Sequence, residues 1–153
     1  MFLITKIFSF AAAHHLIRYH GKCERPHGHN YRLEISVLGE KGENDLVLDF
    51  VLLKKLVKDT VLSRLDHHNL NDFFDNPTAE VIAEWIWHQL FPLSEKLLPY
   101  RNEANFPEEI INLLKDPSGA KIDDGSENIV LFEVKLWETD TSIVLYRGPH
   151  GNF

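Results

Sequence analysis

A regular alternation between positions 29 and 37 restricts the fold of this chain more than any other feature. Every second position belongs to one set: His29, Tyr31, Leu33, Ile35 and Val37. The positions between them include Arg32, Glu34 and Ser36. Successive side chains of a strand point to opposite faces, so the pattern predicts a strand with one apolar and one polar face.

Three further strands are expected around this one. The first covers 2–16, where four apolar residues recur at period two: Phe2, Ile4, Phe8 and Phe10. The last two are expected at 129–138 and 142–148, joined at T-D-T.

Two helices are expected between the second and third strands. Asp49 is a suitable N-cap for a helix over 50–64, because apolar residues then recur at three- and four-residue spacing. A second helix is expected to start near N-P-T-A-E, with Pro77 in its first turn, and to run to about Phe91.

Four prolines interrupt the stretch 92–128, where only P-E-E-I-I-N-L-L-K indicates a short helix. We interpret this stretch as a surface insertion in a single domain that spans 1–153. The resulting order, β-β-α-α-β-β, predicts the α+β class.

Composition excludes several partners. A net charge of -7, with no run of basic residues longer than two, argues against a nucleic-acid partner. No segment approaches the ~18 apolar residues of a membrane span, so no membrane partner is expected. The lone Cys23 has no partner for an internal disulfide, and a cytoplasmic protein with a free thiol is predicted.

Histidines gather in the first part of the chain, where seven of the nine precede residue 69. His27 and His29 share a strand face and can converge on one ion, with His14 or His15 as a third ligand. Three imidazoles with an open fourth position are typical of catalytic zinc. The alternative is a pair of ordinary polar histidines near a strand start.

Two other groups are candidates for proton transfer. Cys23 lies among charged residues, which favours a reactive thiol over an inert buried one. Asp66 is followed by His67 and His68, and a carboxylate can fix the tautomer of an imidazole that moves protons. An Asp beside a His is weak evidence alone, since helix ends often carry both.

Glu138 shares parity with four apolar residues of its strand: Val130, Phe132, Val134 and Leu136. A carboxylate on an apolar face is costly unless it meets donors. The two parallel N–H groups of an amino-pyrimidinone ring would satisfy it. Alternatively, Glu138 lies at the strand end and reaches water.

Four motifs in order resemble those of the 6-pyruvoyl-tetrahydropterin synthase and 6-carboxytetrahydropterin synthase family. They are A-A-H-H-L, C-E-R-P-H-G-H-N-Y, L-D-H-H-N-L and W-E-T. The resemblance covers about 1–91 and 128–148, and the stretch 92–128 departs from compact members. It implies the tunnelling fold: an antiparallel sheet with two helices on one face, assembled into an oligomeric barrel, usually a hexamer of two trimers with active sites between subunits.

The resemblance also implies roles for individual residues. His14, His27 and His29 hold Zn²⁺, with His15 at a variable position. Cys23 is the proton-abstracting thiol, Asp66 and His67 form a dyad contributed across the interface, and Glu138 with Thr139 anchors the pterin.

The implied substrate is 7,8-dihydroneopterin triphosphate, which loses triphosphate while internal redox reduces its ring. Three residues separate Cys23 from His27, as in the bacterial, queuosine-pathway branch, which forms 6-carboxy-5,6,7,8-tetrahydropterin and acetaldehyde. The alternatives are pyruvoyl formation or aldolase-like cleavage on the same fold, a zinc-dependent hydrolase, and a noncatalytic zinc-binding module.

Overall fold

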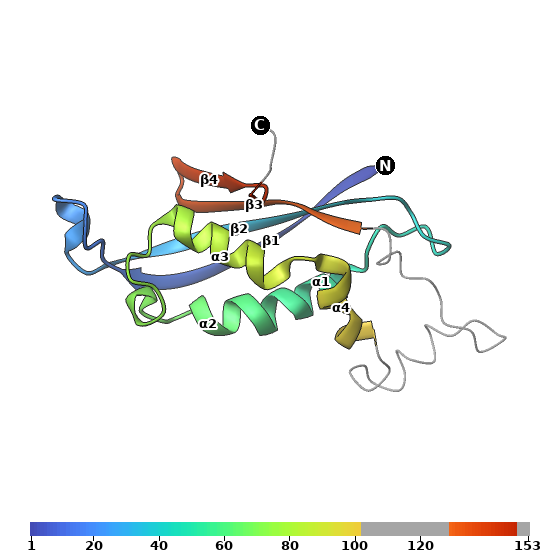
Figure 1. Ribbon diagram of the computed structural model, residues 1–153, viewed down its shortest axis with the longest axis horizontal. Coiled ribbons are helices and arrows are strands. Elements are labelled where there is room, and N and C mark those ends of the chain that lie inside the picture. The colour runs from blue at the N-terminus through green and yellow to red at the C-terminus, as the bar shows by residue number, and fades with distance from the viewer. Residues whose placement is uncertain (102–128, 150–153) are drawn as a thin grey trace.

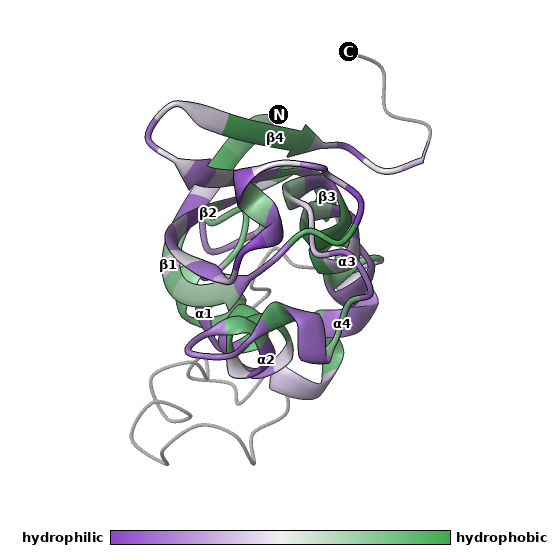
Figure 2. Ribbon diagram, turned by 90° about the vertical axis from the view of Figure 1, so that its left-hand side faces the viewer, coloured by the Kyte–Doolittle hydropathy of each residue, from purple (hydrophilic) through white to green (hydrophobic). Residues whose placement is uncertain are grey.

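The computed structural model describes residues 1–101 and 129–149. Within them, four antiparallel strands form one sheet in the order β1-β2-β3-β4. The strands are β1 (Phe2–His14), β2 (His27–Gly39), β3 (Ile129–Thr139) and β4 (Ser142–Tyr146). The helices α1 to α4 all lie on the same side of this sheet (Figure 1, Figure 2). The predicted α+β class, with helices covering one face of an antiparallel sheet, is therefore confirmed.

The first predicted helix is confirmed as a helical run in three parts. Asp49 caps α1 (Phe50–Val57) by accepting the N–H of Val51 at 2.7 Å. A π-helical turn (Lys58–Leu62) follows and leads into α2 (Ser63–Leu65).

The second predicted helix is α3 (Ala79–Leu90), whose N-cap is Thr78. The Thr78 side chain accepts the N–H of Val81 at 3.3 Å. Pro77 therefore precedes the cap, and its expected place in the first helical turn is wrong. This position leaves the Pro77 carbonyl free to meet a side chain of the sheet.

The expected surface insertion is wrong for residues 93–101. They form α4 (Leu93–Arg101), and Leu93 and Leu97 are buried in the core. Their four-residue spacing puts both on one face of the helix. The short helix expected in P-E-E-I-I-N-L-L-K lies outside the described residues.

A β-bulge changes the predicted parity of β3. The register with β2 shifts between Ser36 and Val37, so Ile129 and Leu131 face the core before the bulge and Val134 faces it afterwards. Val130, which was expected to share a face with Val134, is 57% exposed. Glu138 also follows this bulge, but it lies at a second irregularity, where the register with β4 shifts between Trp137 and Thr139.

Three strand ends also differ from the prediction. β1 stops at His14 rather than at residue 16, β3 runs to Thr139 rather than to residue 138, and β4 stops at Tyr146 rather than at residue 148. Among the described residues, no helix is long and apolar enough to cross a membrane.

Candidate metal centre and active site

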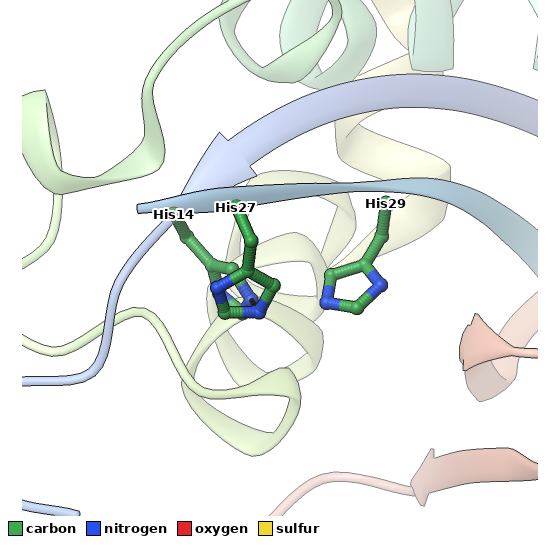
Figure 3. Close-up of side chains that lie close together, drawn as sticks. All are labelled: His14, His27 and His29. Carbon is green, nitrogen blue, oxygen red and sulfur yellow. Dashed lines mark hydrogen bonds between the residues drawn. The ribbon is translucent and has the colours of Figure 1, made fainter. Parts of the chain in front are cut away.

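Three histidines converge where β1 ends and β2 begins. His14 is the last residue of β1 and lies opposite His27, the first residue of β2, while His29 follows two residues later on the same face. Ring centroids are 4.6 Å apart for His14 and His27, 5.1 Å for His14 and His29, and 4.9 Å for His27 and His29. The three imidazoles project from the same side of the strands toward one another (Figure 3). The structure thus selects His14 over His15.

Backbone carbonyls orient two of these rings. His14 Nδ1 lies 2.8 Å from the carbonyl oxygen of Pro77, and His27 Nδ1 lies 2.8 Å from that of Arg25. A carbonyl can only accept, so each Nδ1 must carry the proton. In the neutral ring this tautomer leaves a lone pair on Nε2, which is the form that binds a metal.

The cluster fits a metal ion bound by three imidazoles. One ligand nitrogen from each of the three rings lies within 4.8 Å of the others, and the two Nε2 atoms of His14 and His27 are 3.1 Å apart. Tetrahedral ligands at about 2.0–2.1 Å from zinc would be roughly 3.3 Å apart, which is close to this separation. Burial lowers the pKa of His29, with Glu138 opposing this shift and the two other histidines adding to it. Lowering the pKa favours the neutral ring that coordination requires.

Glu138 borders the three-histidine cluster. Its Oε1 lies 3.7 Å from His14 Nε2, and its side chain is 27% exposed. The carboxylate is therefore partly shielded by the protein and partly accessible from outside it. The predicted partner Thr139 is exposed, and its hydroxyl accepts the N–H of Thr141 at 3.3 Å in the hairpin turn.

Cys23 lies in the 3₁₀ turn Lys22–Glu24, on the loop that joins β1 to β2. It is half-buried, and its carbonyl accepts the N–H of Leu16 at 2.8 Å. Its thiol is not part of the set of atoms that lie within 4.8 Å of one another. Cys23 therefore lies on the loop beside the three-histidine cluster, but its thiol is not part of that cluster.

Asp66 pairs with His67 rather than with the ring of His68. Asp66 Oδ1 lies 2.9 Å from His67 Nδ1, whereas His68 Nδ1 donates to the backbone carbonyl of Asp66 at 2.9 Å. Asp66 Oδ1 also accepts the N–H of Ala11 at 3.0 Å, and this bond is the main reason why the pKa of Asp66 is lowered. His67 has a left-handed backbone (φ 62) and is 81% exposed. The dyad thus exists, but its imidazole faces solvent and is separate from the three-histidine cluster.

Sequence reasoning missed several residues that shape the site. The carbonyls of Pro77 and Arg25, which orient the rings of His14 and His27, are backbone groups that every residue has, so residue type does not reveal them. Tyr31 shares the strand face of His29, yet its burial beside the cluster was not foreseen: its ring lies 5.6 Å from that of His29, and it is 1% exposed. Within the described residues its hydroxyl has no hydrogen-bond partner, and burial raises the pKa of Tyr31. Asn71, which bonds the backbone of His15, was also missed, although it is the last residue of the motif L-D-H-H-N-L-N.

An open pocket of about 420 Å³ lies between the loop after β1 and the segment that leads into α3. It is lined by Arg18, Phe73, Phe74, Asp75, Asn76 and Val81. None of the predicted site residues lines it, so this pocket is distinct from the candidate active site.

Comparison with known proteins identifies the family. The model of the 6-pyruvoyl tetrahydropterin synthase family matches residues 3–103. The chain belongs to this family. A 6-carboxy-5,6,7,8-tetrahydropterin synthase of Haemophilus influenzae is 31% identical over 96% of this chain and 99% of its own length. One from Synechocystis is 41% identical over 59% of this chain and 75% of its own length.

Solved structures of the 6-pyruvoyl tetrahydropterin synthase family agree with the fold. The Caenorhabditis elegans 6-pyruvoyl tetrahydropterin synthase superposes with a TM-score of 0.64 at 26% identity, covering 96% of this chain and 95% of that one. The predicted tunnelling fold of the subunit is therefore confirmed, and the protein is an enzyme of the pterin synthase family.

Proposed function

We propose that the protein is a zinc-dependent lyase that converts 7,8-dihydroneopterin triphosphate to 6-carboxy-5,6,7,8-tetrahydropterin, releasing acetaldehyde and triphosphate. The observation that carries this proposal is the convergence of His14, His27 and His29 in a chain of this family. Atom balance requires that one water is consumed, because the products together hold two hydrogens and one oxygen more than the substrate.

A zinc ion held by these three nitrogens would supply Lewis acidity to oxygens of the substrate side chain and acidify the adjacent C–H bonds. Cys23, as thiolate, would take a proton from one face of that side chain. His67, held by Asp66, would move a proton on the opposite face. Glu138 would accept two N–H groups of the pterin ring, with Thr139 assisting.

The proposed assembly is a homo-hexamer, a dimer of trimers, in the cytoplasm. Two observations support the oligomer. The dyad imidazole is exposed and separate from the three-histidine cluster, which is the arrangement expected if a neighbouring subunit presents one to the other. β1 is also an edge strand of the sheet: within the described residues its outer edge is bridged to the segment after α2 only near its end, at Ala13 and Asn69, and no strand pairs with its earlier residues. Light scattering of the purified protein measures the mass directly, and a monomer that turns over substrate would contradict this part of the proposal.

The sister activity, 6-pyruvoyl-tetrahydropterin formation, is the second candidate. A 6-pyruvoyl tetrahydrobiopterin synthase of Dictyostelium discoideum is 30% identical over 95% of this chain. The carboxy-forming branch is preferred because relatives of that name reach higher identity and because three residues separate Cys23 from His27.

Product analysis tests the proposal. The purified protein, loaded with zinc, is incubated with 7,8-dihydroneopterin triphosphate, with the His27→Ala variant as the control. Acetaldehyde together with a carboxylated tetrahydropterin is the expected result. A pyruvoyl product without acetaldehyde would move the protein to the sister branch. No turnover with zinc bound at His27 would refute pterin lyase activity, and full turnover by Cys23→Ala would favour a hydrolase that needs no thiol.

A further inference from the structure

The last part of β1 is paired along its outer edge by the segment 66–76. The backbone groups of alternate residues are bonded in turn, first within β1 and then in the two positions 15 and 17 beyond its end. The bonds are Ala11 N–H to Asp66 Oδ1 at 3.0 Å, His67 N–H to the Ala11 carbonyl at 2.6 Å, Ala13 N–H to the His68 carbonyl at 3.0 Å, His15 N–H to Asn71 Oδ1 at 2.9 Å, and Ile17 N–H to Asn76 Oδ1 at 3.0 Å. The segment thus takes the place of a neighbouring strand, with side-chain oxygens standing in for some carbonyls.

Asn71 makes the most complete substitution in this edge pairing. Its Oδ1 accepts from the N–H of His15, and its Nδ2 donates to the carbonyl of His15 at 2.9 Å. One side chain therefore satisfies both backbone groups of one residue, as a paired strand residue would. Asn71 is itself held, because its own N–H lies 3.3 Å from Oδ1 of Asn69 and the adjacent Leu70 is fully buried.

His15, whose backbone Asn71 holds, directly follows His14 of the three-histidine cluster. His14 is the last residue of β1, so past its pairing with His27 the chain has no ladder partner on the β2 side. The imidazole of His14 is oriented by the Pro77 carbonyl, but the direction of its Cα–Cβ bond depends on the backbone that runs into His15. The N–H of Leu16, the residue after His15, donates to the Cys23 carbonyl. The position of the loop that carries Cys23 therefore depends on the same backbone segment, His14 to Leu16.

We propose that Asn71 is a positioning residue that fixes the end of β1 and so sets the affinity of the three-histidine cluster for its metal. This inference rests on the proposed metal site. Asn71 touches no reacting atom and acts through His14. Removing it leaves all three imidazoles present but releases the backbone that aims one of them.

The test compares Asn71→Ala with Asn44→Ala. Asn44 is equally half-buried, and its Oδ1 also accepts a backbone N–H, that of Leu46 at 3.0 Å, but it lies in the loop between β2 and α1. Hydrogen exchange of the metal-free protein reports the protection of the His15 amide. Competition with a chromophoric chelator gives the zinc dissociation constant, and the visible spectrum of the Co²⁺ form reports the ligand geometry.

Asn71→Ala is expected to lose His15 amide protection, to weaken zinc binding by about 10- to 100-fold, as for other groups that orient metal ligands, and to alter the Co²⁺ spectrum. Asn44→Ala is expected to change none of the three. Should Asn71→Ala fail to fold, Asn71→Asp retains the acceptor and loses the donor, and intermediate values are expected for it.

Unchanged zinc affinity in Asn71→Ala, or equal weakening in both alanine variants, would overturn the inference and leave Asn71 a purely structural residue. These results leave the proposed function intact. If the wild-type protein binds no zinc at His27, the metal site and the inference fail together, and the wild-type titration alone shows it.

Discussion

Replacing His14 or His15 by alanine separates the two ligand assignments that strand parity leaves open and tests the choice of His14. His14 is 1% exposed, and its Nδ1 donates to the Pro77 carbonyl. His15 is half-buried, and within the described residues its side chain makes no hydrogen bond. His14→Ala is therefore expected to remove a metal ligand and also to leave a buried carbonyl unpaired, whereas His15→Ala removes neither.

The two effects differ in size and can be measured separately. Without metal, the unpaired Pro77 carbonyl costs His14→Ala about 1–3 kcal/mol, which at roughly 2–4 °C per kcal/mol for a chain of this size lowers Tm by about 2–12 °C. With free zinc at about 1,000 times Kd, the wild-type protein gains about 4 kcal/mol, or roughly 8–16 °C. His15→Ala is expected to show this full zinc shift and a metal-free Tm close to that of the wild type.

Differential scanning calorimetry of the metal-free and zinc-titrated proteins provides both numbers. His14→Ala should melt lower without metal and respond to zinc weakly or not at all. The reasoning is refuted if His14→Ala retains the full zinc shift, or if His15→Ala is the variant that loses it.

Three further substitutions are informative. Cys23→Ala is expected to keep zinc and its thermal shift but to lose about 10²-fold or more in turnover, measured by product formation; undiminished turnover would remove the thiol from the mechanism. Tyr31→Phe deletes a buried hydroxyl with no partner among the described residues, so urea unfolding should show stability unchanged or raised by about 1 kcal/mol, and a clear loss would contradict this. Asp66 has a lowered pKa, so its charge stabilises the fold above its unfolded pKa of about 4, and this contribution is lost as pH falls through the folded value. Asp66→Asn should therefore flatten the acid limb of stability between pH 6 and 3, and parallel curves for the two proteins would rule this out.

The three-histidine cluster was largely predictable from the sequence because parity along a strand is a local property. The alternation of β2 places His27 and His29 on one face whatever the rest of the chain does. Strand parity alone did not choose between His14 and His15, because that choice depends on where β1 stops; only the family resemblance pointed to His14. Its pairing with β2 ends at His14 opposite His27, which is a non-local contact.

Two errors in the predicted fold have the same non-local origin. The bulge in β3 follows from its pairing with β2, and no residue between Ile129 and Leu136 signals it. The helix α4 was not predicted because its sequence contains a proline. Leu93 and Leu97 have helical spacing, but the core contacts that stabilise the helix come from other parts of the chain.

The L-D-H-H-N-L-N motif combines proton-transfer candidates with the groups that pair the end of β1. Asp66 illustrates this, because one oxygen both binds His67 and accepts the Ala11 N–H. Loss of activity in Asp66→Ala would therefore have two explanations, because the substitution removes the carboxylate of the dyad and also the bond to the Ala11 N–H that holds the end of β1. Asn keeps an oxygen that can accept from Ala11 and removes only the charge, so activity lost in Asp66→Asn with zinc affinity retained would belong to the dyad. Zinc affinity lost together with activity would instead show that this edge pairing links the dyad to the metal cluster.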